Sequence, residues 1–161
     1  MPIKVGDKLP SATFRVMTAE GPKPKTTDDI FKGKKVALFA VPGAFTPTCT
    51  NLHMPSFLNN AAAFKSKGVD TIAVTGVNDV FVMEAWKKST GADGKVEFLA
   101  DGNADFAKAI DMTLDASGNG LGIRSKRYSM LVENGVVKKL NIEDAPGKCD
   151  ISGGQALLGQ I

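Results

Sequence analysis

The chain has 161 residues, enough for one domain with a sizeable core and too few for two, so we expect residues 1–161 to form a single domain. The net charge is only +3 and the basic residues are scattered, which argues against a nucleic-acid partner. No apolar run is long enough to span a membrane, and residues 1–10 lack the apolar core of a signal peptide. We therefore expect no membrane partner and a cytoplasmic location.

The first third of the chain predicts a buried strand that leads into a helix. Residues 1–35 are extended and rich in turns, and their several Pro and Gly residues exclude a long helix. Residues 13–17 alternate enough to predict a short strand. Residues 36–41 form an apolar run between lysines and Pro42, which is typical of a buried central strand. A loop then opens a helix that we expect to reach about Lys67, with a kink or break at Pro55. The apolar positions Leu52, Phe57, Ala61 and Phe64 are spaced to face a core.

The middle of the chain alternates between strands and helices. We expect a second buried strand over residues 69–77 and a third over residues 96–100. Asn78–Asp79 can cap a helix that runs to about Ser89, and a shorter helix is expected over residues 104–110. A glycine-rich loop over residues 115–122 follows.

The last third contains a hairpin and a short terminal helix. The β-rich runs 128–133 and 136–142 are joined by Asn134–Gly135, which predicts a tight two-residue turn. Residues 152–161 are compatible with a final short helix. Strands that alternate with helices before a hairpin predict an α/β fold in which a central mixed sheet is flanked by helices.

One segment, Pro42–Cys49, places a cysteine where a helix begins after a buried strand. Thr46 suits the N-cap position and Pro47 the first helical position, so Cys49 falls in the first turn. Unpaired backbone N–H groups and the positive end of the helix dipole favour a thiolate there. A thiolate can attack the O–O bond of a peroxide, and the first product is a sulfenic acid. The alternative interpretation is a small buried apolar residue at a helix start.

Peroxide chemistry also needs hydrogen-bond donors around the sulfur. Thr46 supplies a hydroxyl three residues before Cys49, and a nearby arginine would hold the thiolate and polarise the peroxide. Arg124 and Arg127 both lie just before a predicted strand, and spacing alone does not choose between them. Pro42 and Pro47 would shield the sulfur and restrict the loop.

The only histidine, His53, lies four residues after Cys49 and could share its helix face. A Cys–His nucleophilic pair is conceivable, but no partner that would orient the imidazole is evident. We therefore interpret His53 as a polar helix residue near the site. A single histidine also excludes most zinc sites and most His-dependent triads.

The segment Pro42-Gly-Ala-Phe-Thr-Pro-Thr-Cys49 resembles the Pro-x-x-x-Thr-x-x-Cys active-site motif of peroxiredoxins, and its full form is similar to the type-5 branch, which includes plant type II, animal and bacterial members. The resemblance continues, in order, over nearly the whole chain. It is carried by Gly68-Val69-Asp70, Val77-Asn78-Asp79 with Phe81-Val82, Phe98-Leu99-Ala100-Asp101, Arg127-Tyr128-Ser129-Met130 and Asn141-Ile142-Glu143.

This resemblance implies a thioredoxin-like fold, reduction of hydrogen peroxide and alkyl hydroperoxides, and no metal or organic cofactor. Cys49 matches the family's peroxidatic cysteine, Thr46 its hydrogen-bonding threonine and Pro42 its shielding proline. The family's active-site arginine precedes an aromatic residue at a strand start, which favours Arg127. A homodimer is also implied, with the loops around Phe45, Phe81 and residues 118–123 meeting across the interface.

The second cysteine, Cys149, occupies a loop similar to the one that holds the resolving cysteine of animal members. The second cysteine of plant members corresponds to Val74 here and is absent. Either Cys149 closes a disulfide with Cys49, which suits thioredoxin as the reductant, or an external thiol attacks the sulfenic acid, which suits glutathione with glutaredoxin. A bystander thiol on a surface loop is the third possibility.

Two other functions use the same cysteine. A general thiol–disulfide oxidoreductase is disfavoured because Thr46 stands where a C-x-x-C motif would have its first cysteine. A redox sensor or chaperone that changes partners on oxidation remains an alternative or additional role. The leading hypothesis from the sequence is therefore a thiol-dependent peroxidase.

Overall fold

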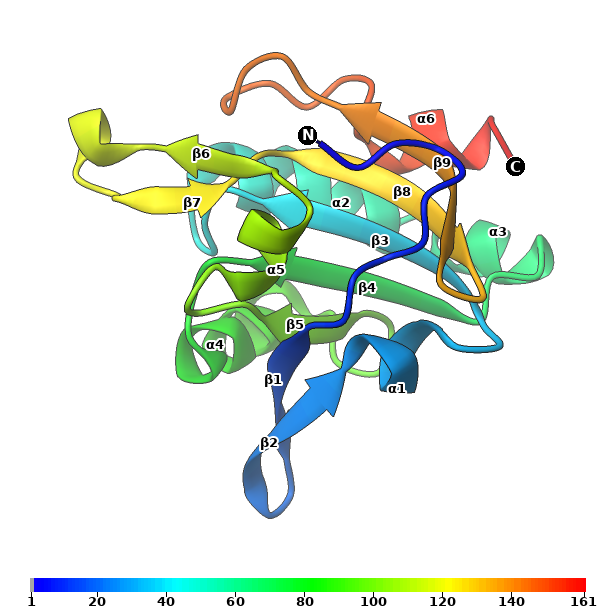
Figure 1. The fold of residues 1–161 in the computed structure, drawn as a ribbon, viewed down its shortest axis with the longest axis horizontal. Coiled ribbons are helices and arrows are strands. Elements are labelled where there is room, and N and C mark those ends of the chain that lie inside the picture. Colours follow the sequence, from blue (N-terminus) through cyan, green and yellow to red (C-terminus); the bar gives the residue numbers. More distant parts are fainter. Residues whose placement is uncertain (1) are drawn as a thin grey trace.

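The computed structural model describes residues 2–161 and is built around a mixed sheet covered by helices on both faces (Figure 1). The seven strands lie in the order β2-β1-β5-β4-β3-β8-β9. Their bounds are β1 (Thr13–Thr18), β2 (Gly21–Thr26), β3 (Lys35–Val41), β4 (Thr71–Gly76), β5 (Glu97–Ala100), β8 (Tyr128–Glu133) and β9 (Val136–Ile142). Strands β3, β4 and β5 are parallel, and the other neighbouring pairs are antiparallel.

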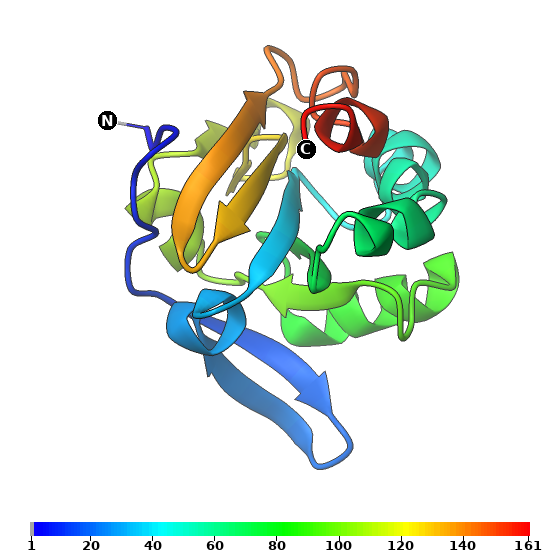
Figure 2. The same ribbon diagram turned by 90° about the vertical axis from the view of Figure 1, so that its right-hand side faces the viewer.

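The helices divide between the two faces of the sheet, as the side view in Figure 2 shows. Their bounds are α1 (Thr27–Phe31), the π-helical turn η1 (Cys49–His53), α2 (Met54–Leu58), α3 (Ala61–Ser66), α4 (Val80–Thr90), α5 (Asp105–Ala109) and α6 (Gly154–Leu158). One buried apolar cluster lies where η1, α2, α3, α4 and α6 pack, and includes Phe39, Phe57 and Trp86. The other lies where α1, α5 and the N-terminal segment pack, and includes Phe14 and Tyr128. Strand β3 therefore has apolar side chains buried on both of its faces.

The predicted tight hairpin between β8 and β9 is confirmed. Both residues of its turn have positive φ, 49° at Asn134 and 79° at Gly135. This combination requires residues that tolerate left-handed backbone, which is why Asn–Gly is a strong turn signal. The hairpin places Arg127, the residue before β8, at the edge of the sheet where β3 ends.

The structure differs from the predictions in three regions of the chain. Residues 21–26 form the edge strand β2, in which Pro22 and Pro24 are tolerated because they need no outer partner. The glycine-rich region forms a small ribbon of β6 (Thr113–Asp115) and β7 (Ile123–Ser125), joined through the 3₁₀ turn η2 (Ser117–Asn119). The helix expected to reach Lys67 is divided at residues 59–60 rather than at Pro55. Leu52 was expected to face the core but is 57% exposed.

Candidate active site

The loop between β3 and the following helix is held rigidly at the carboxyl end of the parallel strands. Thr46 donates from both its backbone N–H and its hydroxyl to the Gly43 carbonyl, at 3.3 and 2.7 Å. The Ala44 N–H donates to Asn78 Oδ1 at 2.9 Å, which ties the loop to the end of β4. Phe45 has a positive φ of 66°, an unfavourable conformation for a non-glycine residue that the surrounding bonds stabilise.

Cys49 lies where the predicted helix begins, but the helix there has π geometry. Helical residues begin at Pro47, the Thr50 N–H donates to the Thr46 carbonyl at 3.0 Å, and the Met54 N–H reaches back to the Cys49 carbonyl. Pro55 has no N–H with which to continue an ordinary α-helical ladder through this turn. Single π turns within helices are frequent at functional sites. The proline thus follows a widened helical turn, which contains the cysteine, and does not kink the helix as predicted.

The Cys49 sulfur is fully buried against a guanidinium group. Arg127 Nη2 donates to Cys49 Sγ at 3.0 Å, and Arg127 is itself only 2% exposed. The Pro146 carbonyl accepts from Arg127 Nε at 3.1 Å and from Nη2 at 3.0 Å. The Cys49 sulfur therefore accepts a charge-assisted hydrogen bond from a buried guanidinium group. The arginine is therefore fixed in place by its own hydrogen bonds before any substrate arrives.

His53 completes the support of that guanidinium group. Its Nε2 lies 2.9 Å from the Ser152 carbonyl, which can only accept, so Nε2 carries the proton. Its Nδ1 is then free to accept from Arg127 Nη1, also at 2.9 Å. Burial, followed by the charge of Arg127, lowers the pKa of His53 to about 3, so the imidazole is neutral at ordinary pH. His53 thus holds the arginine and is not itself a charged partner of the sulfur.

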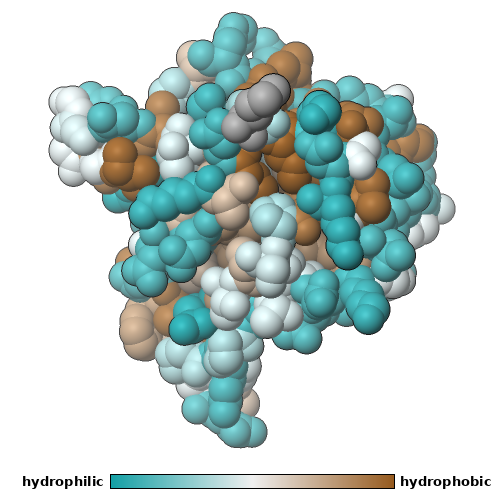
Figure 3. All heavy atoms as spheres, in the orientation of Figure 1, coloured by the Kyte–Doolittle hydropathy of each residue, from teal (hydrophilic) through white to brown (hydrophobic). Residues whose placement is uncertain are grey.

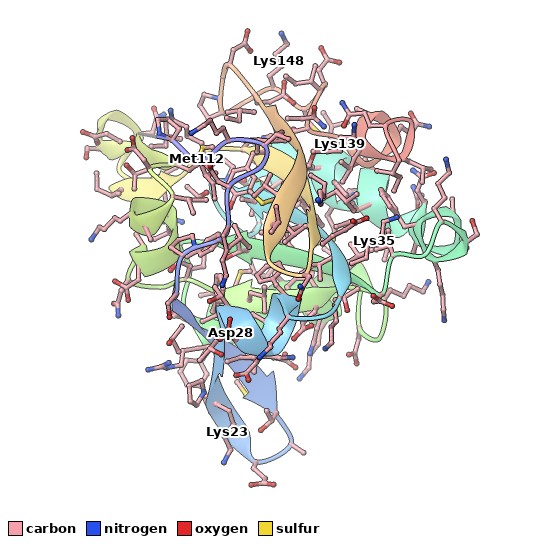
Figure 4. The ribbon with its side chains drawn as sticks, turned by 45° about the vertical axis from the view of Figure 1, so that its right-hand side comes forward. Lys23, Asp28, Lys35, Met112, Lys139 and Lys148 are labelled. Atoms are coloured by element: carbon pink, nitrogen blue, oxygen red, sulfur yellow. The ribbon has the colours of Figure 1, made fainter. Side chains whose placement is uncertain are left out.

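Cys149 lies on a loop that hydrogen bonds hold against the helix of Cys49. Thr48 Oγ1 donates to the Gly147 carbonyl at 3.1 Å, on the segment just before Cys149. Glu143 Oε2 accepts from the Asp150 N–H and from the N–H and hydroxyl of Ser152, at 2.8, 2.8 and 2.5 Å. Figure 4 shows the neighbouring Lys148 at the outer end of this loop, pointing away from the sheet.

The two thiols differ in their environment. Cys49 is buried and Cys149 half-buried, and no disulfide joins them. Burial raises the pKa of the Cys149 thiol, with the charge of Arg127 acting in the opposite direction. Burial also acts to raise the pKa of Glu143, but its bonds from Ser152 and Asp150 leave that pKa below its ordinary value. A carboxylate therefore organises the loop that carries Cys149.

Among the residues selected from the sequence, the structure brings Arg127 into contact with Cys49, and Thr46 lies just before the same helix start, with its hydroxyl on the Gly43 carbonyl. Pro42 is buried at the end of β3, whereas Pro47 is exposed. Arg124 does not contact the sulfur and instead approaches the loop at Gly43.

Sequence reasoning missed the roles of two groups that shape the site. The partner that orients His53 is Ser152, which lies 99 positions away and was not predicted. Glu143 was noted only as part of a family motif, although its carboxylate holds the Ser152 segment. The four-residue separation of His53 from Cys49 was the one available signal.

In residues 2–161 no group of three or more His, Cys, Asp or Glu side chains could hold a metal ion. None of the helices in that range is long and apolar enough to cross a membrane.

A cysteine at the start of a helix, beside an arginine and at the carboxyl end of a mixed sheet, defines a thiol-based redox protein. Residues 4–158 match the family model described as Redoxin. Peroxiredoxin-2C of Oryza sativa is 46% identical over 158 residues, which cover 98% of this chain and 97% of the relative. Reduced Prx3 from Vibrio vulnificus, crystallised in complex with H₂O₂, has a TM-score of 0.93 and 46% identity over 98% of both chains. The chain therefore belongs to the Redoxin family, in its peroxiredoxin group.

The similarity confirms the predicted thioredoxin-like α/β fold with its mixed central sheet. Chloroplastic Peroxiredoxin-2E of Arabidopsis thaliana is 47% identical over 146 residues, which cover 88% of this chain but only 62% of the relative. The chain thus spans less than two thirds of the length of that relative.

Proposed function

We propose that this protein is a thiol-dependent peroxidase that reduces hydrogen peroxide and alkyl hydroperoxides with Cys49. The observation that carries the proposal is the buried contact of 3.0 Å between Cys49 Sγ and Arg127 Nη2 at the start of a helix. Family membership supports it, because its relatives include named peroxiredoxins.

In the first half-reaction the Cys49 thiolate attacks the terminal oxygen of the hydroperoxide. The S–O bond forms as the O–O bond breaks, so that sulfur is oxidised and the peroxide is reduced. The hydroxyl stays on sulfur as Cys49 sulfenic acid, and the departing alkoxide takes up a proton to become an alcohol, or water when the substrate is hydrogen peroxide. No metal or organic cofactor takes part in this scheme.

Arg127 and the helix start would stabilise the charge that moves from sulfur to the departing oxygen. The guanidinium is already oriented by His53 and by the Pro146 carbonyl, so little reorganisation is needed during the reaction. The Thr46 hydroxyl, held against the Gly43 carbonyl, is the proposed hydrogen-bonding partner of the peroxide. Pro42, buried at the start of the loop, is proposed to shield the sulfur from water.

For the second half-reaction we propose that Cys149 resolves the sulfenic acid. Its thiolate would attack Cys49 Sγ, forming the S–S bond and releasing hydroxide, which becomes water on protonation. The hydrogen bond from Thr48 to Gly147 supports this role, because it holds the loop of Cys149 against the helix of Cys49. A dithiol protein such as thioredoxin would then reduce the disulfide. Direct attack by glutathione, with glutaredoxin, is the other possible route.

The proposal extends to the whole chain and its assembly. We propose that residues 1–161 form one domain, supported by two apolar clusters that share a single sheet. We also propose a homodimer, in which the exposed side chains of Phe45, Phe81, Leu121 and Ile123 would be covered. Figure 3 shows a hydrophobic patch among neutral and hydrophilic atoms on the projecting β6–β7 ribbon. Two free thiols suit a reducing compartment, and we propose the cytoplasm.

The test is to treat the wild type and Cys149→Ser with one equivalent of hydrogen peroxide and measure intact masses. We expect the wild type to lose two hydrogens, with Cys49 and Cys149 joined in the peptide map, and the variant to carry a sulfenic acid on Cys49. A sulfenic acid in both proteins would leave Cys149 without a resolving role and favour glutathione. An unmodified Cys49 in both would refute the peroxidase proposal.

A further inference from the structure

A second guanidinium group, that of Arg124, lies beside the loop of the candidate active site. Arg124 belongs to β7, and its Nε donates to the Leu121 carbonyl at 2.9 Å, which fixes the orientation of the side chain. Its Nη1 lies 3.2 Å from the point where a Gly43 Cβ would stand, and Thr46 Cγ2 lies 3.1 Å from the same point. The charge of Arg124 is thus next to the residues that position Thr46.

The Arg124 guanidinium group has N–H donors that no group of the protein uses. Within residues 2–161, Arg124 forms no ion pair with a carboxylate, and its two Nη groups make no hydrogen bond. It is only partly exposed, whereas Arg127 is buried with all its donating nitrogens engaged. Arg124 is therefore a partly desolvated cation whose planar fork is available to an external anion.

The position of the Arg124 guanidinium suits a group of the substrate that lies away from the peroxide. Gly43 lacks a side chain that would separate Arg124 from Thr46, the proposed hydrogen-bonding partner of the peroxide. A guanidinium binds a carboxylate through two parallel hydrogen bonds, a geometry that an ester cannot match. We infer that Arg124 is a specificity-determining residue that favours hydroperoxides carrying a carboxylate. This inference rests on the proposed peroxidase function.

The test compares a fatty-acid hydroperoxide, used below its critical micelle concentration, with the methyl ester of the same hydroperoxide. The two probes share the peroxide and the chain and differ only in charge. The rate of the first half-reaction can be followed by the fluorescence of Trp86, the only tryptophan, whose Nε1 donates to Thr50 Oγ1 next to Cys49. Single-turnover conditions without reductant restrict the measurement to attack on the hydroperoxide.

Three variants separate the charge of Arg124 from other effects. Arg124→Gln removes the charge, and Arg124→Lys keeps it without the fork. Lys32→Gln removes one positive charge at the C-cap of α1, which leads into β3 at the end opposite the site. We expect Arg124→Gln to slow oxidation by the acid about 3- to 10-fold and leave the ester unchanged, as loss of a partly exposed charge-assisted bond predicts. With the acid, Arg124→Lys should be oxidised at a rate between those of Arg124→Gln and the wild type. Lys32→Gln should be oxidised at the wild-type rate by both probes.

Equal slowing of both probes by Arg124→Gln, or no change with either, would overturn the inference. So would an effect confined to the later reaction with a carboxylate-bearing thiol such as glutathione, because the anion recognised would then belong to the reductant. Failure of the wild type to react with any hydroperoxide, including hydrogen peroxide, would refute the peroxidase function itself and is distinguishable from these results.

Discussion

The two cysteine-bearing segments are held against each other by opposite means. Around Cys49, a buried guanidinium touches the sulfur and is itself fixed by side-chain and carbonyl partners. Around Cys149, the backbone of the loop is fixed through Glu143 and Thr48, while the thiol has a raised pKa because of its burial. The first segment is prepared to react as it stands. In the second, hydrogen bonds fix the backbone of the loop, while burial disfavours the thiolate that a resolving reaction uses.

The largest expected effect comes from Arg127→Gln, which removes the guanidinium group that prepares the Cys49 segment to react. The variant removes the cation that lies against Cys49 Sγ. It also removes the N–H groups that donate to His53 Nδ1 and to the Pro146 carbonyl. We expect oxidation of Cys49 by hydrogen peroxide to slow about 10²- to 10³-fold, the usual consequence of losing one preorganised stabilising donor. Stopped-flow measurement of the Trp86 signal checks this.

Arg15→Gln, an exposed arginine on β1, is the matched control and should retain the wild-type rate. Arg127→Lys keeps a charge but loses the fork, and should recover only part of the activity. A rate within threefold of the wild type in Arg127→Gln would show that the contact with sulfur has no part in the reaction.

The next effect tests how closely the Cys149 segment is packed on the helix of Cys49. At Gly154 in α6, an added Cβ would stand 2.2 Å from the Ser56 carbonyl oxygen of α2, so the two backbones must separate to admit a methyl group. We expect Gly154→Ala to lower the free energy of unfolding by about 1–3 kcal/mol, as overpacking does. Cys149 should also react faster with a thiol reagent, because its loop is attached to α6.

Urea denaturation and the rate of thiol modification measure these two quantities. Gly159→Ala is the control, since the nearest atom to its new Cβ is the Gln155 carbonyl oxygen at 3.5 Å, an ordinary contact. If both variants were equally stable, close packing of α6 on α2 would not be what holds the loop.

The arrangement of the sheet could be predicted from the sequence to a large extent, because its signals are local. The apolar run of β3 and the Asn134–Gly135 turn each specify an element within a few residues. The edge strand β2 was missed because Pro22 and Pro24 oppose a strand in general, although an edge tolerates them.

The candidate site could be predicted only where its residues follow one another in the chain. The positions of Thr46 and Cys49 follow from the helix start, and Arg127 came from the resemblance to a family. The contacts from His53 to Ser152 and from Arg127 to Cys49 join residues 99 and 78 positions apart, and no local pattern encodes such contacts. The π geometry of η1 also depends on tertiary packing as well as on Pro55.

The smallest effect concerns His53, which links the two segments because it bonds both Arg127 and the Ser152 carbonyl. Burial and the charge of Arg127 lower its pKa from 6.5 to about 3. Below about pH 6.5 the unfolded chain therefore binds a proton that the folded protein does not, and stability falls as the pH falls towards 3. The expected loss is about 1.4 kcal/mol for each pH unit within this window.

His53→Gln, which cannot titrate, isolates this dependence, since His53 is the only histidine in the chain. Urea denaturation of both proteins between pH 6.5 and 5.0 should show the wild type losing stability more steeply than the variant, by about 1.4 kcal/mol per pH unit. Parallel slopes would mean that His53 is protonated in the folded protein. Its Nδ1 could then not accept from Arg127, and the guanidinium beside Cys49 would depend on the Pro146 carbonyl alone for its orientation.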